Sequence, residues 1–174
     1  LAYFGFVSPT KGLEDLFRIA DPDLHRIVLV CDLRGSDLYQ REILGIIGAP
    51  PWKGKVSVTG FLPETEVGRI LSASDAVILP FRGGGTDGSS SLQAAVAQGT
   101  FTLTASPGRH GYDPENNVYS ARPGDIREMS AALAAHAGRR IPREGDFLEN
   151  AWRTIADSHI GFYASGLRRP DTSG

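Results

Sequence analysis

The sequence has 174 residues, a net charge of −2, 41% hydrophobic residues and 22% charged residues. This length suits one domain with its own core, and the composition is that of a globular protein. The charge excludes a basic field that would attract nucleic acid. The single cysteine, Cys31, excludes a disulfide within the chain. No apolar stretch approaches the ~20 residues of a membrane span.

The apolar pattern predicts strands that alternate with helices along the chain. Continuous apolar runs predict buried strands at residues 1–7, 26–31, 55–59, 76–79, 101–104 and 118–120. Apolar residues at helical spacing predict helices at residues 13–20, 36–47, 64–72, 89–98, 125–137 and 147–166. The polar stretch 105–117 is expected to be a loop.

This alternation favours an α/β fold that is doubly wound, with a mostly parallel sheet and helices on both faces. We expect a single Rossmann-like domain over residues 1–166 and a frayed tail over residues 167–174. The first residue is not methionine and lies in an apolar run, so we expect a domain of a longer protein. Ligands of such sheets bind at the carboxyl ends of strands, where residues 8–12, 60–63 and 80–91 are expected to lie.

Residues 82–104 carry the strongest functional signal, RGGGTDGSSSLQAAVAQGTFTLT. A glycine-rich loop there leads into three serines and a helical pattern. Free amides at a helix N-terminus bind anions, phosphate above all, where glycines allow close approach. Ser89 can cap this helix, and Ser90 and Ser91 can donate hydroxyl groups. From this stretch alone, phosphate binding and simple capping after a flexible loop are both open.

Lys11 lies at the start of the first predicted helix, on the expected ligand edge. A positive charge there is unfavourable, because it faces the positive end of the helix dipole, at a cost of about 0.3–1 kcal/mol in free energy. An anion between Lys11 and the helix end at residues 89–91 would explain this placement. An exposed surface lysine is the alternative.

Other motifs carry less weight. Residues 83–88 match the G-x-G-x-x-G of dinucleotide folds, but they lie mid-chain, and the next predicted strand ends without an acid for a ribose. Residues 21–23 match D-x-D but are expected at the opposite edge of the sheet, as a turn. No histidine has metal-ligand spacing and no nucleophile elbow is present. Arg109, His110 and Tyr112 follow the fifth strand and could touch a sugar or a second substrate.

An ordered set of motifs resembles the C-terminal, nucleotide-sugar-binding domain of retaining GT-B glycosyltransferases, the glycosyltransferase group 1 family. The opening YFGFVSPTKGLEDLFRIA is similar to the family's G-[RF]-x-x-x-x-K-G-x-x-x-L. VSVTGFLPETEVGRILSASDAVILPF, SSSLQAAVAQGTFTLTAS, ENNVYSARPGD and AWRTIADSHIGFYASGL resemble its later blocks, in order. The similarity covers nearly the whole chain.

The resemblance implies a site for the donor, a nucleoside diphosphate sugar. Lys11, with Gly5 and Gly12 of the same motif, matches the group that neutralises the departing diphosphate. Ser91 and Leu92 match the amides that hold the terminal phosphate. The loop of Gly60, Phe61 and Leu62 matches the one beside the nucleobase. No metal or other cofactor is implied.

The sequence departs from the family at three positions. Thr86 and Ala94 replace two glutamates that touch the sugar and the ribose. Phe6 replaces an arginine beside the lysine. We expect Asp87 to stand in for the first acid and Arg82 to replace the arginine's charge. The full set of expected donor-binding residues is Gly5, Lys11, Gly12, Gly60, Phe61, Leu62, Arg82, Thr86, Asp87, Gly88, Ser89, Ser90, Ser91 and Leu92.

The leading hypothesis is therefore the donor-binding half of a hexosyltransferase that retains the anomeric configuration. Its acceptor would bind an N-terminal domain outside this sequence, so the isolated chain is expected to be inactive. The resemblance implies a bacterial enzyme of polysaccharide synthesis in the cytoplasm, with a peripheral place at the inner membrane open for the full-length protein. The alternatives are half of a nucleotide-sugar epimerase and a degenerate, non-catalytic nucleotide-binding or scaffold domain.

Overall fold

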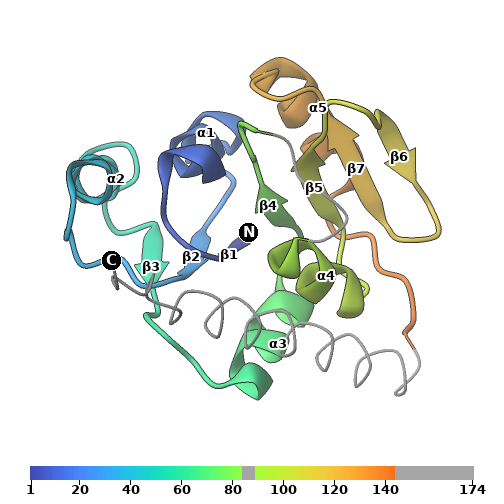
Figure 1. The fold of residues 1–174 in the computed structure, drawn as a ribbon, viewed down its shortest axis with the longest axis horizontal. Coiled ribbons are helices and arrows are strands. Elements are labelled where there is room, and N and C mark those ends of the chain that lie inside the picture. The colour runs from blue at the N-terminus through green and yellow to red at the C-terminus, as the bar shows by residue number, and fades with distance from the viewer. Residues whose placement is uncertain (84–88, 144–174) are drawn as a thin grey trace, which may run out of the picture.

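The computed structural model describes residues 1–83 and 89–143, which form a seven-stranded sheet of order β3-β2-β1-β4-β5-β7-β6 (Figure 1). The strands are β1 (Ala2–Phe4), β2 (Ile27–Val30), β3 (Val56–Val58), β4 (Val77–Leu79), β5 (Thr102–Ala105), β6 (Gly111–Asp113) and β7 (Val118–Ala121). The helices are η1 (Pro9–Lys11), α1 (Leu13–Ile19), α2 (Leu38–Gly48), α3 (Glu64–Ala73), α4 (Ser90–Ala97) and α5 (Ile126–His136).

The strand order runs outward from β1 in both directions. β1 pairs in parallel with both β2 and β4, so the path moves outward to β3 and then returns to the other side of β1. Figure 1 shows α1, α2 and α5 over one face of the sheet and α3 and α4 over the other. This confirms the doubly wound α/β fold, and it makes β1 and β4 the switch point beside which such sheets bind ligands.

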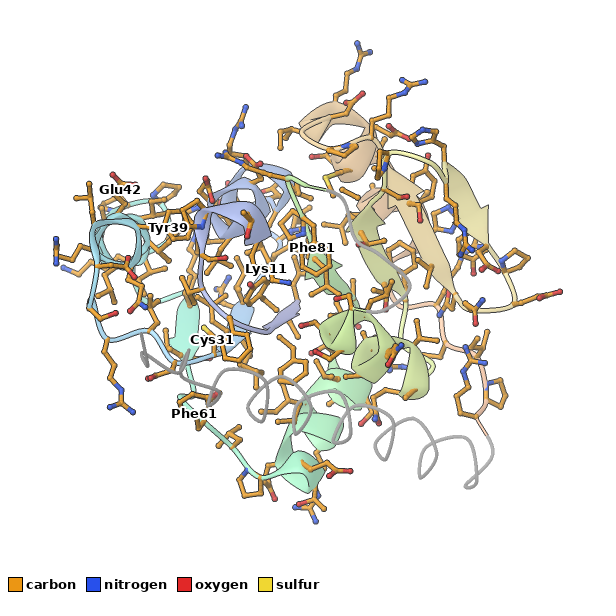
Figure 2. The ribbon with its side chains drawn as sticks, in the orientation of Figure 1. Lys11, Cys31, Tyr39, Glu42, Phe61 and Phe81 are labelled. Atoms are coloured by element: carbon orange, nitrogen blue, oxygen red, sulfur yellow. The ribbon has the colours of Figure 1, made fainter. Side chains whose placement is uncertain are left out.

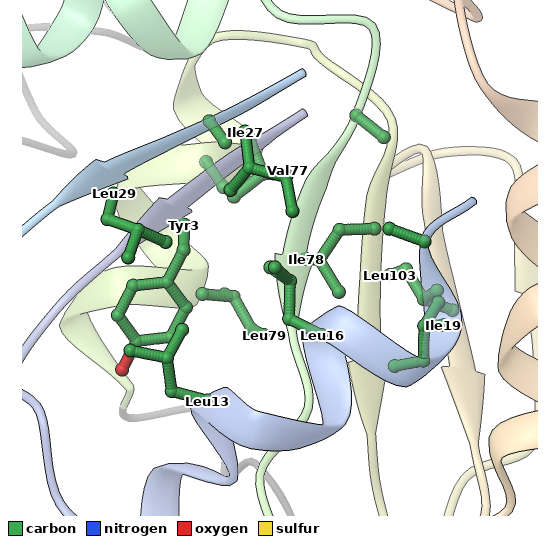
Figure 3. Packing of buried hydrophobic residues seen from close by; sticks show 14 of the residues in the cluster. Tyr3, Leu13, Leu16, Ile19, Ile27, Leu29, Val77, Ile78, Leu79 and Leu103 are labelled. Atoms are coloured by element: carbon green, nitrogen blue, oxygen red, sulfur yellow. The ribbon is translucent and has the colours of Figure 1, made fainter. Parts of the chain in front are cut away.

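The core lies between the central strands and the helices that cover them. Every residue of β4 and β5 is buried, whereas Ser57 and Val58 of the edge strand β3 are exposed. Figure 3 shows Leu13 and Leu16 of α1 among side chains of β1 and β4. Each such buried side chain contributes roughly 1.5–3 kcal/mol through the removal of apolar surface from water. Continuous apolar strands therefore form the centre of the sheet, as the sequence pattern predicts.

The expected strands and helices within the described residues are confirmed, with ends that shift by a few residues. One strand was missed, because β6 lies inside the stretch expected to be a loop. β6 has three half-buried residues and pairs antiparallel with β7 at the edge of the sheet, so it shows no apolar run. The predicted helix 147–166 and the tail lie outside the described residues.

An aromatic cluster joins β6 and β7 to α5. The ring of His136, at the end of α5, stacks on Tyr112 with centroids 4.3 Å apart and on Phe101 with centroids 5.4 Å apart. Burial, and to a smaller extent the charge of Arg139, lowers the pKa of His136. Its buried Nδ1 has no hydrogen-bond partner in the part of the chain that the structure describes. The folded state therefore favours the neutral imidazole.

We predict that protonation of His136 destabilises the fold. The unfolded chain takes up this proton near pH 6.5, whereas the folded chain resists it to a lower pH. The contribution of His136 is thus complete above pH 6.5 and declines as the pH falls from there toward the lower pKa of the folded state. Unfolding in urea between pH 7.5 and 5 should show the stability advantage over a His136→Gln variant narrowing on acidification, by at most ~1.4 kcal/mol per pH unit. A constant or widening advantage would contradict this.

Candidate functional site

The carboxyl ends of β1 and β4 lie side by side, and three segments meet there. The segment after β1 contains Gly5, η1 and Gly12, the segment after β4 contains Phe81 and Arg82, and α4 begins nearby. The structure thus brings together the residues predicted to contact a diphosphate. The contacts among these segments show how closely they are packed.

Gly12 fixes the approach of the first segment to the second. Its φ of +62° is left-handed, and a Cβ atom at this position would lie 2.3 Å from the carbonyl oxygen of Pro80. The amide of Arg82 donates a hydrogen bond to the carbonyl of Thr10 at 3.0 Å. Only glycine combines this conformation with this close approach.

Gly5 places the end of β1 against α4. Its φ is +142°, and a Cβ atom there would lie 2.7 Å from Ser91 Oγ. Ser91 is 6% exposed, and neither its amide nor its hydroxyl has a hydrogen-bond partner within the described ranges. Ser89 is the N-cap, and its Oγ accepts from the amide of Leu92 at 3.5 Å, a long contact. The first turn of α4 therefore retains donors for an anion.

Lys11 ends η1 with its ammonium over an aromatic ring. Nζ lies 4.4 Å from the centroid of Phe81 (Figure 2). Among residues 1–83 and 89–143, no carboxylate lies within 4 Å of Lys11. Burial lowers the pKa of this half-buried lysine. The ring thus positions the ammonium, and no acid of the described residues neutralises its positive charge.

Arg82 is arranged differently, because its guanidinium pairs with two acids of α1. Nη1 lies 2.9 Å from Glu14 Oε1, and Nε lies 3.3 Å from Asp15 Oδ2. Asp15 is 2% exposed and also binds Arg18 at 2.9 Å. The hydroxyl of Tyr39 donates to Glu14 and accepts from the amide at the start of α1. The charge of Arg82 is thus engaged within the fold, and its expected contact with the donor stays a prediction.

The loop expected beside a nucleobase lies after β3, two strands away from β1. Gly60 has a φ of +73°, Phe61 is 73% exposed, and Leu62 packs against the core. No ring contact or hydrogen bond joins Phe61 to Lys11 within the part of the chain that the structure describes. Figure 2 shows Phe61 apart from Lys11 and Phe81, on the side of β3.

The remaining predicted residues lie in several different places. Thr86, Asp87 and Gly88 lie outside the described residues. Ala94 is fully buried in α4, and Phe6 is 56% exposed after β1. Tyr112 belongs to β6, where its hydroxyl binds Asn117 at 2.7 Å and its ring stacks on His136. Ser90 lies in the first turn of α4, as expected.

Sequence reasoning missed Phe81 and the acids that bind Arg82. Phe81 lies two residues after the fourth predicted strand, and Glu14 and Asp15 lie in the first turn of the first predicted helix. Strand order alone could have suggested that these segments meet. The pairing of a ring with Lys11 and of acids with Arg82 required side-chain positions.

We predict that Gly12→Ala destabilises the fold. The new methyl group would collide with a backbone carbonyl and strain a left-handed residue, so we expect a loss of about 2–4 kcal/mol in unfolding free energy. Gly45→Ala is the matched control, since Gly45 is exposed within α2 and a Cβ atom there meets nothing within 4 Å. The control should gain about 0.5–1 kcal/mol. Equal effects of the two changes, measured in urea, would contradict the close approach.

Comparison with known proteins gives structural matches only. No protein-family model and no curated protein sequence matches the chain. Its structure is similar to that of Anabaena HepE in complex with UDP and glucose (TM-score 0.58, 19% identity, covering 95% of this chain and 48% of that one). It is also similar to sucrose-phosphate synthase from Thermosynechococcus elongatus (TM-score 0.66, 18% identity, 94% and 44%).

A third match is the C-terminal domain of LpcC, a glycosyl transferase group 1 family protein from Francisella tularensis (TM-score 0.61, 15% identity, covering 91% of this chain and 84% of that one). The chain spans about half the length of the first two structures and most of this excised domain. No helix among residues 1–83 and 89–143 is long and apolar enough to span a bilayer. The chain has the fold of the C-terminal, nucleotide-sugar-binding domain of GT-B glycosyltransferases.

Proposed function

We propose that this chain is the donor-binding domain of a glycosyltransferase that uses a nucleoside diphosphate sugar. The observation that carries the proposal is the ammonium of Lys11, which no carboxylate neutralises in the described structure. It lies on the same edge of the sheet as the first turn of α4, where the amide of Ser91 has no hydrogen-bond partner among residues 1–83 and 89–143. A cation and a helix N-terminus at one edge of the sheet suit a phosphate-bearing ligand.

The chemistry of sugar transfer explains why such groups would matter. As the bond between sugar and phosphate breaks, negative charge develops on the departing nucleoside diphosphate. A fixed ammonium and free amides stabilise that charge more than they stabilise the bound donor, which lowers the barrier. Lys11 and the amide of Ser91 would take these roles, joined by the amide of Leu92 if the ligand replaces its long 3.5 Å contact with Ser89 Oγ. Thr86 and Asp87 would face the sugar.

The nucleobase would lie toward Gly60, Phe61 and Leu62. Phe61 is 73% exposed, and its ring offers an apolar face that a planar base would bury. Transfer would proceed with retention to an acceptor held by an N-terminal domain. The solved HepE complex, which contains UDP and glucose, supports a uridine donor as the first one to test.

A domain that binds a nucleotide without catalysing transfer is the second candidate. Ala94 favours it, because this residue is fully buried where the family has a glutamate, and no carboxylate reaches the crevice from that position. Calorimetric titration with UDP, GDP and ADP, followed by the matching sugars, tests both candidates. Binding of a nucleotide but not of its sugar conjugate would favour the second.

We predict that Lys11→Ala weakens nucleoside diphosphate binding by about 1.5–3 kcal/mol, because a charge-assisted hydrogen bond would be lost. Lys53→Ala is the matched control, since Lys53 is an exposed lysine in the turn before β3, at the opposite edge of the sheet. The control should bind with unchanged affinity. Calorimetry of the three proteins in one buffer gives the comparison. Equal affinities of the chain and Lys11→Ala would remove Lys11 from the site.

We predict that the 174-residue chain alone does not transfer sugar, because the acceptor and any general base would belong to an N-terminal domain. Incubation with UDP-, GDP- and ADP-sugars and candidate acceptors, with released nucleotide measured by chromatography, checks this. Acceptor-dependent release by the chain alone would contradict the division of roles between two domains.

A further inference from the structure

The ammonium of Lys11 needs a contact that fixes its position, because a lysine side chain has four rotatable bonds and the site proposed above requires a fixed charge. A carboxylate would hold the ammonium but would cancel its charge and repel a phosphate. Within residues 1–83 and 89–143, the contact that the structure gives to Lys11 Nζ is the ring of Phe81, 4.4 Å from its centroid. An aromatic face attracts a cation through its quadrupole and carries no net charge.

Phe81 is itself firmly held. It is 3% exposed, and its amide binds the carbonyl of Leu79 at 2.9 Å. The next residue, Arg82, is fixed by the amide bond to Thr10 and by the ion pairs with Glu14 and Asp15. The ring of Phe81 therefore lies on a segment that is hydrogen-bonded to the segment carrying Lys11.

We propose that Phe81 is a positioning residue that holds the Lys11 ammonium in place, charged and free to bind an anion. This inference rests on the proposed donor site and deepens it. The two cations at this edge of the sheet then have different roles. Arg82 is neutralised by acids and fixes the backbone, while Lys11 rests on an uncharged ring and keeps its charge for the ligand.

The test replaces Phe81 with Leu and, separately, with 3,4,5-trifluorophenylalanine. Leucine keeps an apolar side chain, and the fluorinated ring keeps nearly the same shape but loses the negative potential of its face. Calorimetry with UDP, GDP and ADP should show affinity about 3- to 10-fold weaker for both variants. In a Lys11→Met background, Phe81→Leu should have no further effect, because its influence acts through Lys11.

Phe17→Leu is the matched control. Phe17 is a buried phenylalanine of α1 that packs edge-on against Trp52, with centroids 5.6 Å apart. This variant removes a core ring without touching Lys11 and should bind the nucleotide with unchanged affinity. If Lys11→Ala weakens binding while both Phe81 variants bind as the unaltered chain does, the positioning role is overturned.

A second measurement does not depend on nucleotide binding. If no nucleotide binds, the proposed donor site fails, and the pKa of Lys11 then decides the inference. The signal of Lys11 in a chain carrying ¹³C-labelled lysine is identified by its loss in Lys11→Met. The charged groups of the two segments, Arg82, Glu14 and Asp15, are the same in all variants. A pKa that falls further in both Phe81 variants supports the contact, and an unchanged pKa overturns it.

Discussion

The close approach of two chain segments at the switch point of the sheet is the constraint on which the candidate site depends. Gly12 allows it, because any side chain there would overlap the Pro80 carbonyl. The hydrogen bond from Arg82 to Thr10 and the ion pairs with α1 then close the contact. Without this approach, Lys11 would have no ring beneath it. The site is therefore a product of backbone geometry first and of side-chain chemistry second.

The placement of charge follows from this geometry. The positive charge of Arg82 is neutralised within the fold by ion pairs with Glu14 and the buried Asp15. Lys11 has no acidic partner among the described residues, and the amide of Ser91, which has no hydrogen-bond partner there, adds the partial positive charge of a helix end. This edge of the sheet thus combines a buried acid, Asp15, with the ammonium of Lys11. In the proposed donor site, Phe6 brings no charge, so the attraction for a diphosphate would come from Lys11 and the first turn of α4.

The sequence predicted the fold well, because buried parallel strands are short continuous apolar runs and the helices between them are amphipathic. It failed at β6, where Gly111 and Tyr112 lie at the sheet edge and no apolar run marks the strand. For the site, a lysine that opposes a helix dipole and a glycine-serine loop predict Lys11 and Ser91, and the structure places both residues at the carboxyl ends of β1 and β4. The pairing of Arg82 with Asp15 could not be predicted, because Asp15 lies 67 residues earlier and its burial depends on tertiary packing.

The two outer strands of the sheet have a consequence for how copies of the chain meet. β3 and β6 are each three residues long, so each edge exposes few unpaired backbone groups. β6 also runs against the direction of the other strands, and it covers the side of β7 that a longer parallel strand could extend. Short edges are poor templates for edge-to-edge pairing between chains. The strand lengths therefore protect the described fold from aggregation through its sheet.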